Sequence, residues 1–165
     1  MGLMLSYKKY QPKYFNCITG RPFKPKNIGK YKSWRKEEYD DAGNTIYVEH
    51  SHGSWYRCEY NKNKLIIYEE NSEGFWAKRE YDEYKNLLTY SDSNNNWEKS
   101  QYDKNGNQTY YENSEDYWEK CEYDSNGRKI YSENSDGFWT RWEYTNGKLT
   151  AIYESETDNC RILWD

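Results

Sequence analysis

The chain has 165 residues, a formal net charge of -4 at pH 7 and a mean hydropathy of -1.41. Hydrophobic residues make up only 35%, much of it Tyr and Trp, which excludes a conventional aliphatic core. Aromatic residues make up 19%, and this argues against disorder because disordered chains are poor in aromatics. The class that remains is a thin β-sheet whose aromatic rings and long charged side chains cover each other across strands.

Residues 1–33 form a basic arm. They contain eight Lys or Arg and no Asp or Glu, whereas residues 34–165 hold the other 16 basic and all 28 acidic residues, so +8 and -12 sum to -4. The simplest role of the arm is to fold back on the acidic part and cover its first edge. The alternative is sequence-independent contact with nucleic-acid phosphates. The candidate polyanion contacts are Lys8, Lys9, Lys13, Arg21, Lys24 and Lys26.

Residues 34–159 are an internal repeat with a period of 21 residues. Six tryptophans keep this step: Trp34, Trp55, Trp76, Trp97, Trp118 and Trp139. Six tyrosines keep it as well: Tyr39, Tyr60, Tyr81, Tyr102, Tyr123 and Tyr144. A fixed period of this length predicts one small supersecondary unit that packs against copies of itself.

Each repeat is predicted to contain two short strands and two turns. The segments 124–127 and 134–137 place Asp or Asn first and Gly fourth, which suits a type I turn closed by a left-handed Gly. In the third repeat Lys85 and Asn95 replace these glycines. Between the turns lie runs of five or six residues rich in Tyr, Trp, Ile and Thr.

The predicted fold is therefore all-β: an antiparallel β-hairpin repeat array of six 21-residue repeats and about twelve short strands. An open twisted sheet rarely exceeds about ten strands, so we expect a single coiled or spiralling sheet. Three segments follow: the arm at 1–33, the repeats at 34–159 and a C-terminal capping strand at 160–165.

Charged residues recur as faithfully as the aromatic ones. One basic column lies two residues after each Trp: Lys36, Arg57, Lys78, Lys99, Lys120 and Arg141. A second column contains Glu38, Glu59, Glu80, Gln101, Glu122 and Glu143, and a third contains Glu49, Glu70, Ser91, Glu112, Glu133 and Glu154. We expect ladders of alternating charge, in which each exposed pair contributes only ~0.2–1 kcal/mol.

The Tyr-Asp step followed by a Gly turn and a second Tyr resembles the YD repeat of Rhs and teneurin-type proteins, whose hairpins wind into a spiralling sheet. The resemblance covers residues 34–159. The step is kept in Tyr39-Asp40, Tyr81-Asp82, Tyr102-Asp103 and Tyr123-Asp124, and it is absent at Tyr60-Asn61 and Tyr144-Thr145. MORN-like repeats of antitoxin-type proteins and choline-binding repeats are similar more weakly. The resemblance implies a fold and not a function, because six copies cannot build the shell with which Rhs proteins enclose a toxin.

No catalytic, cofactor or metal site is predicted, and the chain is expected to be non-enzymatic. His50 and His52 could ligate a metal, but they lie in one predicted turn and no zinc-type cluster accompanies them. A serine recurs in every second turn, from Ser51 to Ser135, which is turn chemistry. Carboxylates also recur in each unit, whereas a catalytic pair needs one special site.

The favoured function is a scaffold that binds a macromolecular partner, above all a protein. An acidic array suits a partner with a basic groove, for instance a nucleic-acid-binding protein that it inhibits, as a phage protein could do against host defence. The competing function is a glycan-binding or choline-binding module that uses the Trp and Tyr columns. The candidate partner contacts are Glu70, Glu80, Glu112, Glu122, Glu133, Trp76, Trp97 and Trp118.

The expected compartment is the cytoplasm. Cys58 and Cys121 occupy one column three repeats apart, so a disulfide between them is not expected, and reduced thiols fit a cytosolic setting. Neither a signal peptide nor an apolar run of 18 residues is seen. Gly2 and Ser6 match the short N-myristoylation pattern, which occurs often by chance.

Overall fold

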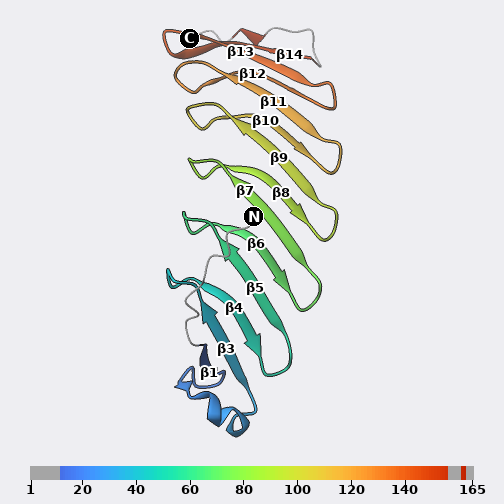
Figure 1. Cartoon of the computed structure of the whole chain (residues 1–165). Coiled ribbons are helices and arrows are strands. Elements are labelled where there is room, and N and C mark those ends of the chain that lie inside the picture. The colour runs from blue at the N-terminus through green and yellow to red at the C-terminus, as the bar shows by residue number, and fades with distance from the viewer. Residues whose placement is uncertain (1–11, 156–160, 163–165) are drawn as a thin grey trace, which may run out of the picture. The chain divides into compact units, whose positions relative to one another are not determined.

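The computed structural model describes residues 12–155 and 161–162. The chain divides into two compact units. Unit 1 comprises residues 1–79 with 92–94, and unit 2 comprises residues 80–91 with 95–165. Each unit is built from antiparallel hairpins joined by short turns (Figure 1).

Unit 1 begins with the arm and continues through the first two repeats. Its elements are β1 (Lys13–Asn16), β2 (Pro22–Phe23), the 3-10 helix η1 (Pro25–Lys30), β3 (Trp34–Tyr39), β4 (Thr45–His50), β5 (Trp55–Tyr60), β6 (Ile66–Asn71) and most of β7 (Trp76–Tyr81). The strands pair in the order β7-β6-β5-β4-β3-β1-β2. The order is linear, so the sheet of this unit is open.

Unit 2 contains the remaining repeats. Its elements are β8 (Leu87–Asp92), β9 (Trp97–Tyr102), β10 (Gln108–Asn113), β11 (Trp118–Tyr123), β12 (Lys129–Asn134), β13 (Trp139–Thr145), β14 (Lys148–Glu154) and β15 (Arg161–Ile162). They also pair in chain order, and β15 lies beside β14. The predicted all-β hairpin-repeat architecture is confirmed, and residues 34–154 hold the expected twelve strands.

The turns have the predicted conformation. Gly127 and Gly137 lie in the left-handed region with φ of +76° and +81°, and each donates its N–H to the first residue of its turn. In the third repeat Lys85 and Asn95 adopt the same region, with φ of +75° and +64°. The left-handed conformation costs a side-chain-bearing residue ~1–2 kcal/mol, with Asn tolerating it best. Turn geometry is therefore kept even where glycine is absent.

The described part of the arm covers the edge of β3. Strand β1 pairs with β3 so that Tyr14 lies opposite Lys36. The Tyr14 ring lies 6.2 Å from that of Trp34 and 5.9 Å from that of Phe23, measured between centroids. The arm thus meets the acidic repeats by edge pairing and aromatic contact.

One face of each sheet holds the core, which we call the packed face. In unit 1 it carries Cys58 and Ala77, which are 1% and 0% exposed. Between them the Glu69 carboxylate accepts a hydrogen bond from the Tyr56 hydroxyl at 2.8 Å and pairs with the Arg79 guanidinium at 2.6 Å. In unit 2 the buried apolar residues are again small, namely Cys121 and Ala151. Small buried residues leave space for broad polar side chains to lie flat over the sheet, as the composition requires.

Candidate functional site

The face opposite the packed face carries the repeated aromatic and charged columns, and we call it the ladder face. Alternation along a strand places Trp55, Arg57 and Glu59 of β5 on this face. Strand β6 contributes Tyr68 opposite Glu59 and Glu70 opposite Arg57. The same side-chain pattern returns on the ladder face of unit 2.

One carboxylate column is paired with the basic column, which confirms the predicted charge ladder. The nitrogen–oxygen distances are 4.0 Å for Lys36–Glu49, 2.8 Å for Arg57–Glu70, 2.9 Å for Lys99–Glu112 and 3.3 Å for Lys120–Glu133. Tyrosine hydroxyls donate to the same carboxylates, at 2.6 Å for Tyr68–Glu70, 3.0 Å for Tyr110–Glu112 and 3.2 Å for Tyr131–Glu133. Three of the predicted partner contacts are therefore already satisfied within the sheet.

This pairing changes the acidity of the ladder. The hydrogen bonds from Lys99 and Tyr110 hold the pKa of Glu112 below its ordinary value of 4.5. Conversely, the bond to the Glu70 carboxylate raises the pKa of the Tyr68 hydroxyl. Glu112 is therefore a stable anion whose charge is largely neutralised by its neighbours.

The other carboxylate column is mixed: Glu38 pairs with Lys36 and Glu143 with Arg141, whereas its three remaining glutamates are exposed. Glu59, Glu80 and Glu122 are solvent-exposed, and none makes an ion pair among the residues that the structure describes. Arg57, for example, turns toward Glu70 rather than Glu59. The predicted partner contacts include Glu80 and Glu122 but not Glu59, because the spacing of the columns does not reveal which glutamates are left without an ion pair. We call Glu59, Glu80 and Glu122 the free carboxylates.

Three tryptophans of the column are covered by the chain's own lysines. The ammonium groups lie over the rings at 5.5 Å for Lys78–Trp76, 4.9 Å for Lys99–Trp97 and 4.9 Å for Lys120–Trp118. An ammonium over an indole ring occupies the place that a quaternary ammonium ligand would take. The arrangement favours a structural role for these tryptophans over choline binding.

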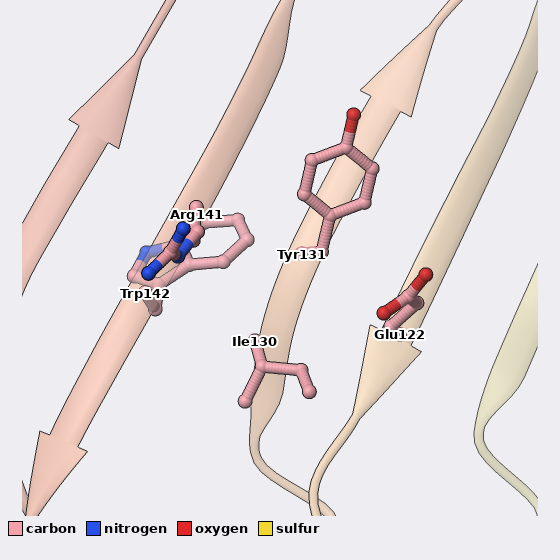
Figure 2. Close-up of a pocket in the computed structure, with 5 residues that line it drawn as sticks. All are labelled: Glu122, Ile130, Tyr131, Arg141 and Trp142. Atoms are coloured by element: carbon pink, nitrogen blue, oxygen red, sulfur yellow. The ribbon is translucent and has the colours of Figure 1, made fainter.

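A depression of about 540 Å³ lies on the ladder face of unit 2. Figure 2 shows it between the Glu122 side chain on β11, Ile130 and Tyr131 on β12, and Arg141 and Trp142 on β13. A carboxylate, an aliphatic side chain, a tyrosine ring, a guanidinium and an indole thus line one site. It can accept an apolar group beside a positive one.

The basic arm presents its charges to solvent. Arg21, Lys24 and Lys26 are exposed, and no ion pair involves them within the described part of the chain. The Lys13 ammonium lies 4.7 Å from the centroid of the Tyr39 ring. Lys8 and Lys9 lie outside the described residues.

The recurring serines form hydrogen bonds between turns and strands. Ser51 and Ser93 accept hydrogen bonds from the N–H groups of Trp34 and Trp76, both at 3.3 Å. A hydroxyl that recurs in this role contributes to the fold rather than to one special site.

His50 and His52 stack with their ring centroids 5.4 Å apart, and His52 bonds to the Ser54 hydroxyl at 2.7 Å. Over residues 12–155 and 161–162, no group of three or more metal-ligating side chains comes together. Within the same part of the chain, no helix is long and apolar enough to cross a membrane.

No protein-family model and no curated protein matches the sequence. Among solved structures, the Photorhabdus luminescens Tc holotoxin pore is similar at 14% identity and a TM-score of 0.47, covering 78% of this chain and 9% of that one. The TcdB2-TccC3 crystal structure is similar at 13% identity and a TM-score of 0.45, and the similarity covers 90% of this chain and 11% of that one. The crystal structure of its complex with Cdc42 is similar at 13% identity and a TM-score of 0.44, with the same coverage of 90% and 11%.

The chain spans about a tenth of the length of these proteins. At TM-scores below 0.5 the similarities assign neither a family nor a function. What the structure itself shows is a succession of β-hairpin repeats, four of which carry the Tyr-Asp step. The YD-repeat family, and with it the weaker MORN-like similarity, stays a prediction from the sequence motifs.

Proposed function

We propose that the chain is a non-enzymatic scaffold whose ladder face binds a protein with a basic surface. The free carboxylates carry this proposal. In the second repeat, Glu70 is neutralised by Arg57, whereas Glu59 remains exposed and unpaired, so the ladder face keeps an excess of negative charge. Charge of this kind steers a basic partner and selects against acidic ones.

Two further features support a binding role. The array from residue 34 to 165 carries a charge of -12, from 16 basic and 28 acidic residues. Its side chains also repeat, so many weak contacts can add along one face. A partner that itself binds nucleic acid offers the complementary basic groove, and inhibition of such a protein in the cytoplasm is the specific form of the proposal. The free thiols of Cys17, Cys58 and Cys121 are consistent with that compartment.

A capture experiment tests the proposal. The full chain is compared with a variant in which the free carboxylates become lysine, Glu59→Lys with Glu80→Lys and Glu122→Lys. The matched control makes the same charge change at exposed turn glutamates, Glu73→Lys with Glu83→Lys and Glu115→Lys. Bound proteins from a cell lysate are identified by mass spectrometry.

We expect one stoichiometric basic partner that the control retains, that the free-carboxylate variant loses and that high salt weakens. Equal retention or equal loss by the two variants would show that the ladder face is not the binding surface. Circular dichroism of each variant checks that the sheet is intact.

The arm supports a second candidate, contact with nucleic acid. Its exposed Arg21, Lys24 and Lys26 lack ion pairs among the described residues. Removing three phosphate contacts should lower the magnitude of the salt slope of binding by about two to three. Fluorescence anisotropy with single-stranded DNA compares the chain with its Arg21→Gln, Lys24→Gln and Lys26→Gln triple variant. An unchanged slope would exclude this role for the arm.

A further inference from the structure

A second depression, of about 530 Å³, lies in unit 1, where ladder-face residues of two consecutive repeats line it together with Cys58 and Tyr60. Its lining contains a glutamate and an isoleucine from each repeat, together with a tyrosine and a cation. These residues are Glu38, Ile46, Tyr47, Arg57, Glu59 and Ile67. Glu38 and Glu59 are 21 residues apart, as are Ile46 and Ile67, so the same half-site occurs twice. We call this depression the double groove.

The depression of unit 2 repeats this half-site. Glu122, Ile130, Tyr131 and Arg141 are the residues that the 21-residue period places at the same positions (Figure 2). Two depressions in separate units with the same residue pattern show that the groove belongs to the repeat itself. The fourth repeat lacks two of these residues, because Thr109 takes the position of the isoleucine and Gln101 that of the glutamate.

The chemistry of the double groove fits a positively charged group beside an apolar one. Its lining carries the cations Lys36 and Arg57 against the anions Glu38, Asp40 and Glu59. Lys36 is bonded to Glu38 at 2.6 Å, and Arg57 to Glu70 at 2.8 Å, which leaves Glu59 exposed and unpaired. Ile46 and Ile67 supply apolar surface next to these carboxylates. A ligand therefore gains most by placing a cation on Glu59.

The spacing of the half-sites selects the conformation of the ligand. Two strands separate one half-site from the next, which is ~9.6 Å at ~4.8 Å per strand. A polyproline II segment repeats every three residues and advances about 9.3 Å per turn. A β-strand returns to the same face every two residues, or about 6.8 Å, and does not match. The polyproline II period brings equivalent side chains to successive half-sites and fits their spacing more closely than an α-helix, which returns to one face after seven residues, or about 10.5 Å.

We propose that the double groove binds a polyproline II segment of the protein partner that carries Lys or Arg at every third position. One of its cations meets the unpaired Glu59, a second displaces the Lys36 ammonium from Glu38, and the residues between them lie on Ile46 and Ile67. Aromatic-lined grooves that recognise preformed polyproline II helices lose little conformational entropy on binding. The inference rests on the proposed function, since it names the part of a basic partner that the ladder face recognises.

Two synthetic peptides test it by fluorescence anisotropy with the full chain. One is a nonapeptide with Arg at every third position and Pro elsewhere, and the other has the same composition with its three Arg residues consecutive. We expect the periodic peptide to bind about tenfold more tightly, the effect of one additional charge-assisted hydrogen bond. Glu59→Gln should remove this advantage, whereas the matched Glu73→Gln, in an exposed turn, should keep it.

The outcomes separate the two proposals. If both peptides bind equally and Glu59→Gln weakens both, the acidic face binds cations and the polyproline II inference is wrong. If Glu59→Gln and Glu73→Gln behave alike, the double groove is not the site. If neither peptide binds while the capture experiment succeeds, this inference fails alone, and if both experiments fail the proposed function fails with it.

Discussion

The two faces of the sheet in unit 1 carry the same residue types, but these residues have different roles on each face. On the packed face of unit 1, Glu69 is bonded to Tyr56 and Arg79 between buried Cys58 and Ala77. On the ladder face, the next residue, Glu70, pairs with the half-exposed Arg57. The difference lies in solvent access, because screening by water reduces an exposed pair far more than a part-buried one. Of these two neighbouring glutamates, Glu69 therefore stabilises the fold, whereas Glu70 forms part of the exposed surface.

The largest expected effect tests this contrast directly. Glu69→Ala removes the shared partner of Tyr56 and Arg79, so we expect it to lower the free energy of unfolding by about 2–3 kcal/mol. Glu70→Ala, one residue away, should lower it by less than about 1 kcal/mol. Urea unfolding followed by circular dichroism measures both. Equal losses would show that the two faces do not differ energetically.

A smaller loss of stability is expected when a buried apolar side chain of the packed face is enlarged. Ala77 is fully buried, whereas its neighbour Lys78 on the ladder face is exposed. Ala77→Leu should destabilise the chain by about 1–2 kcal/mol because the packed face has no space for the added carbons. Lys78→Leu should change stability by less than ~0.5 kcal/mol. A tolerated Ala77→Leu would contradict the close packing of this face.

The smallest expected effect is on the pKa of one carboxylate of the ladder face. Lys99 and Tyr110 lower the pKa of Glu112, so its contribution to stability is present above its ordinary pKa of 4.5 and is lost as the pH falls through the lowered value. Carboxyl NMR titration should place the midpoint of Glu112 below 4.5, and Lys99→Met should move it upward. A midpoint that Lys99→Met leaves unchanged would mean that the ladder pair does not form in solution.

The turns of the third repeat distinguish local from long-range determinants of the left-handed backbone conformation. A turn with glycine in fourth place predicts its own left-handed residue, as at Gly127. Lys85 carries no such signal and Asn95 only a weaker one, yet both adopt the same conformation because the flanking strands of their hairpins fix where each turn begins and ends. Strand pairing on both sides of a turn overrides the local preference of one residue.

The sequence by itself determined the period, the number of strands in the repeats and the glycine turns, since these follow from spacing and local backbone chemistry. It also placed candidate contacts such as Glu112 and Glu122 in regular columns. Only the tertiary structure decided that Glu112 is neutralised by Lys99 while Glu122 stays exposed and without an ion pair among the described residues. The reason is physical: the partner of a side chain depends on the register and side-chain geometry of the neighbouring strand, which a residue's position within its repeat does not contain.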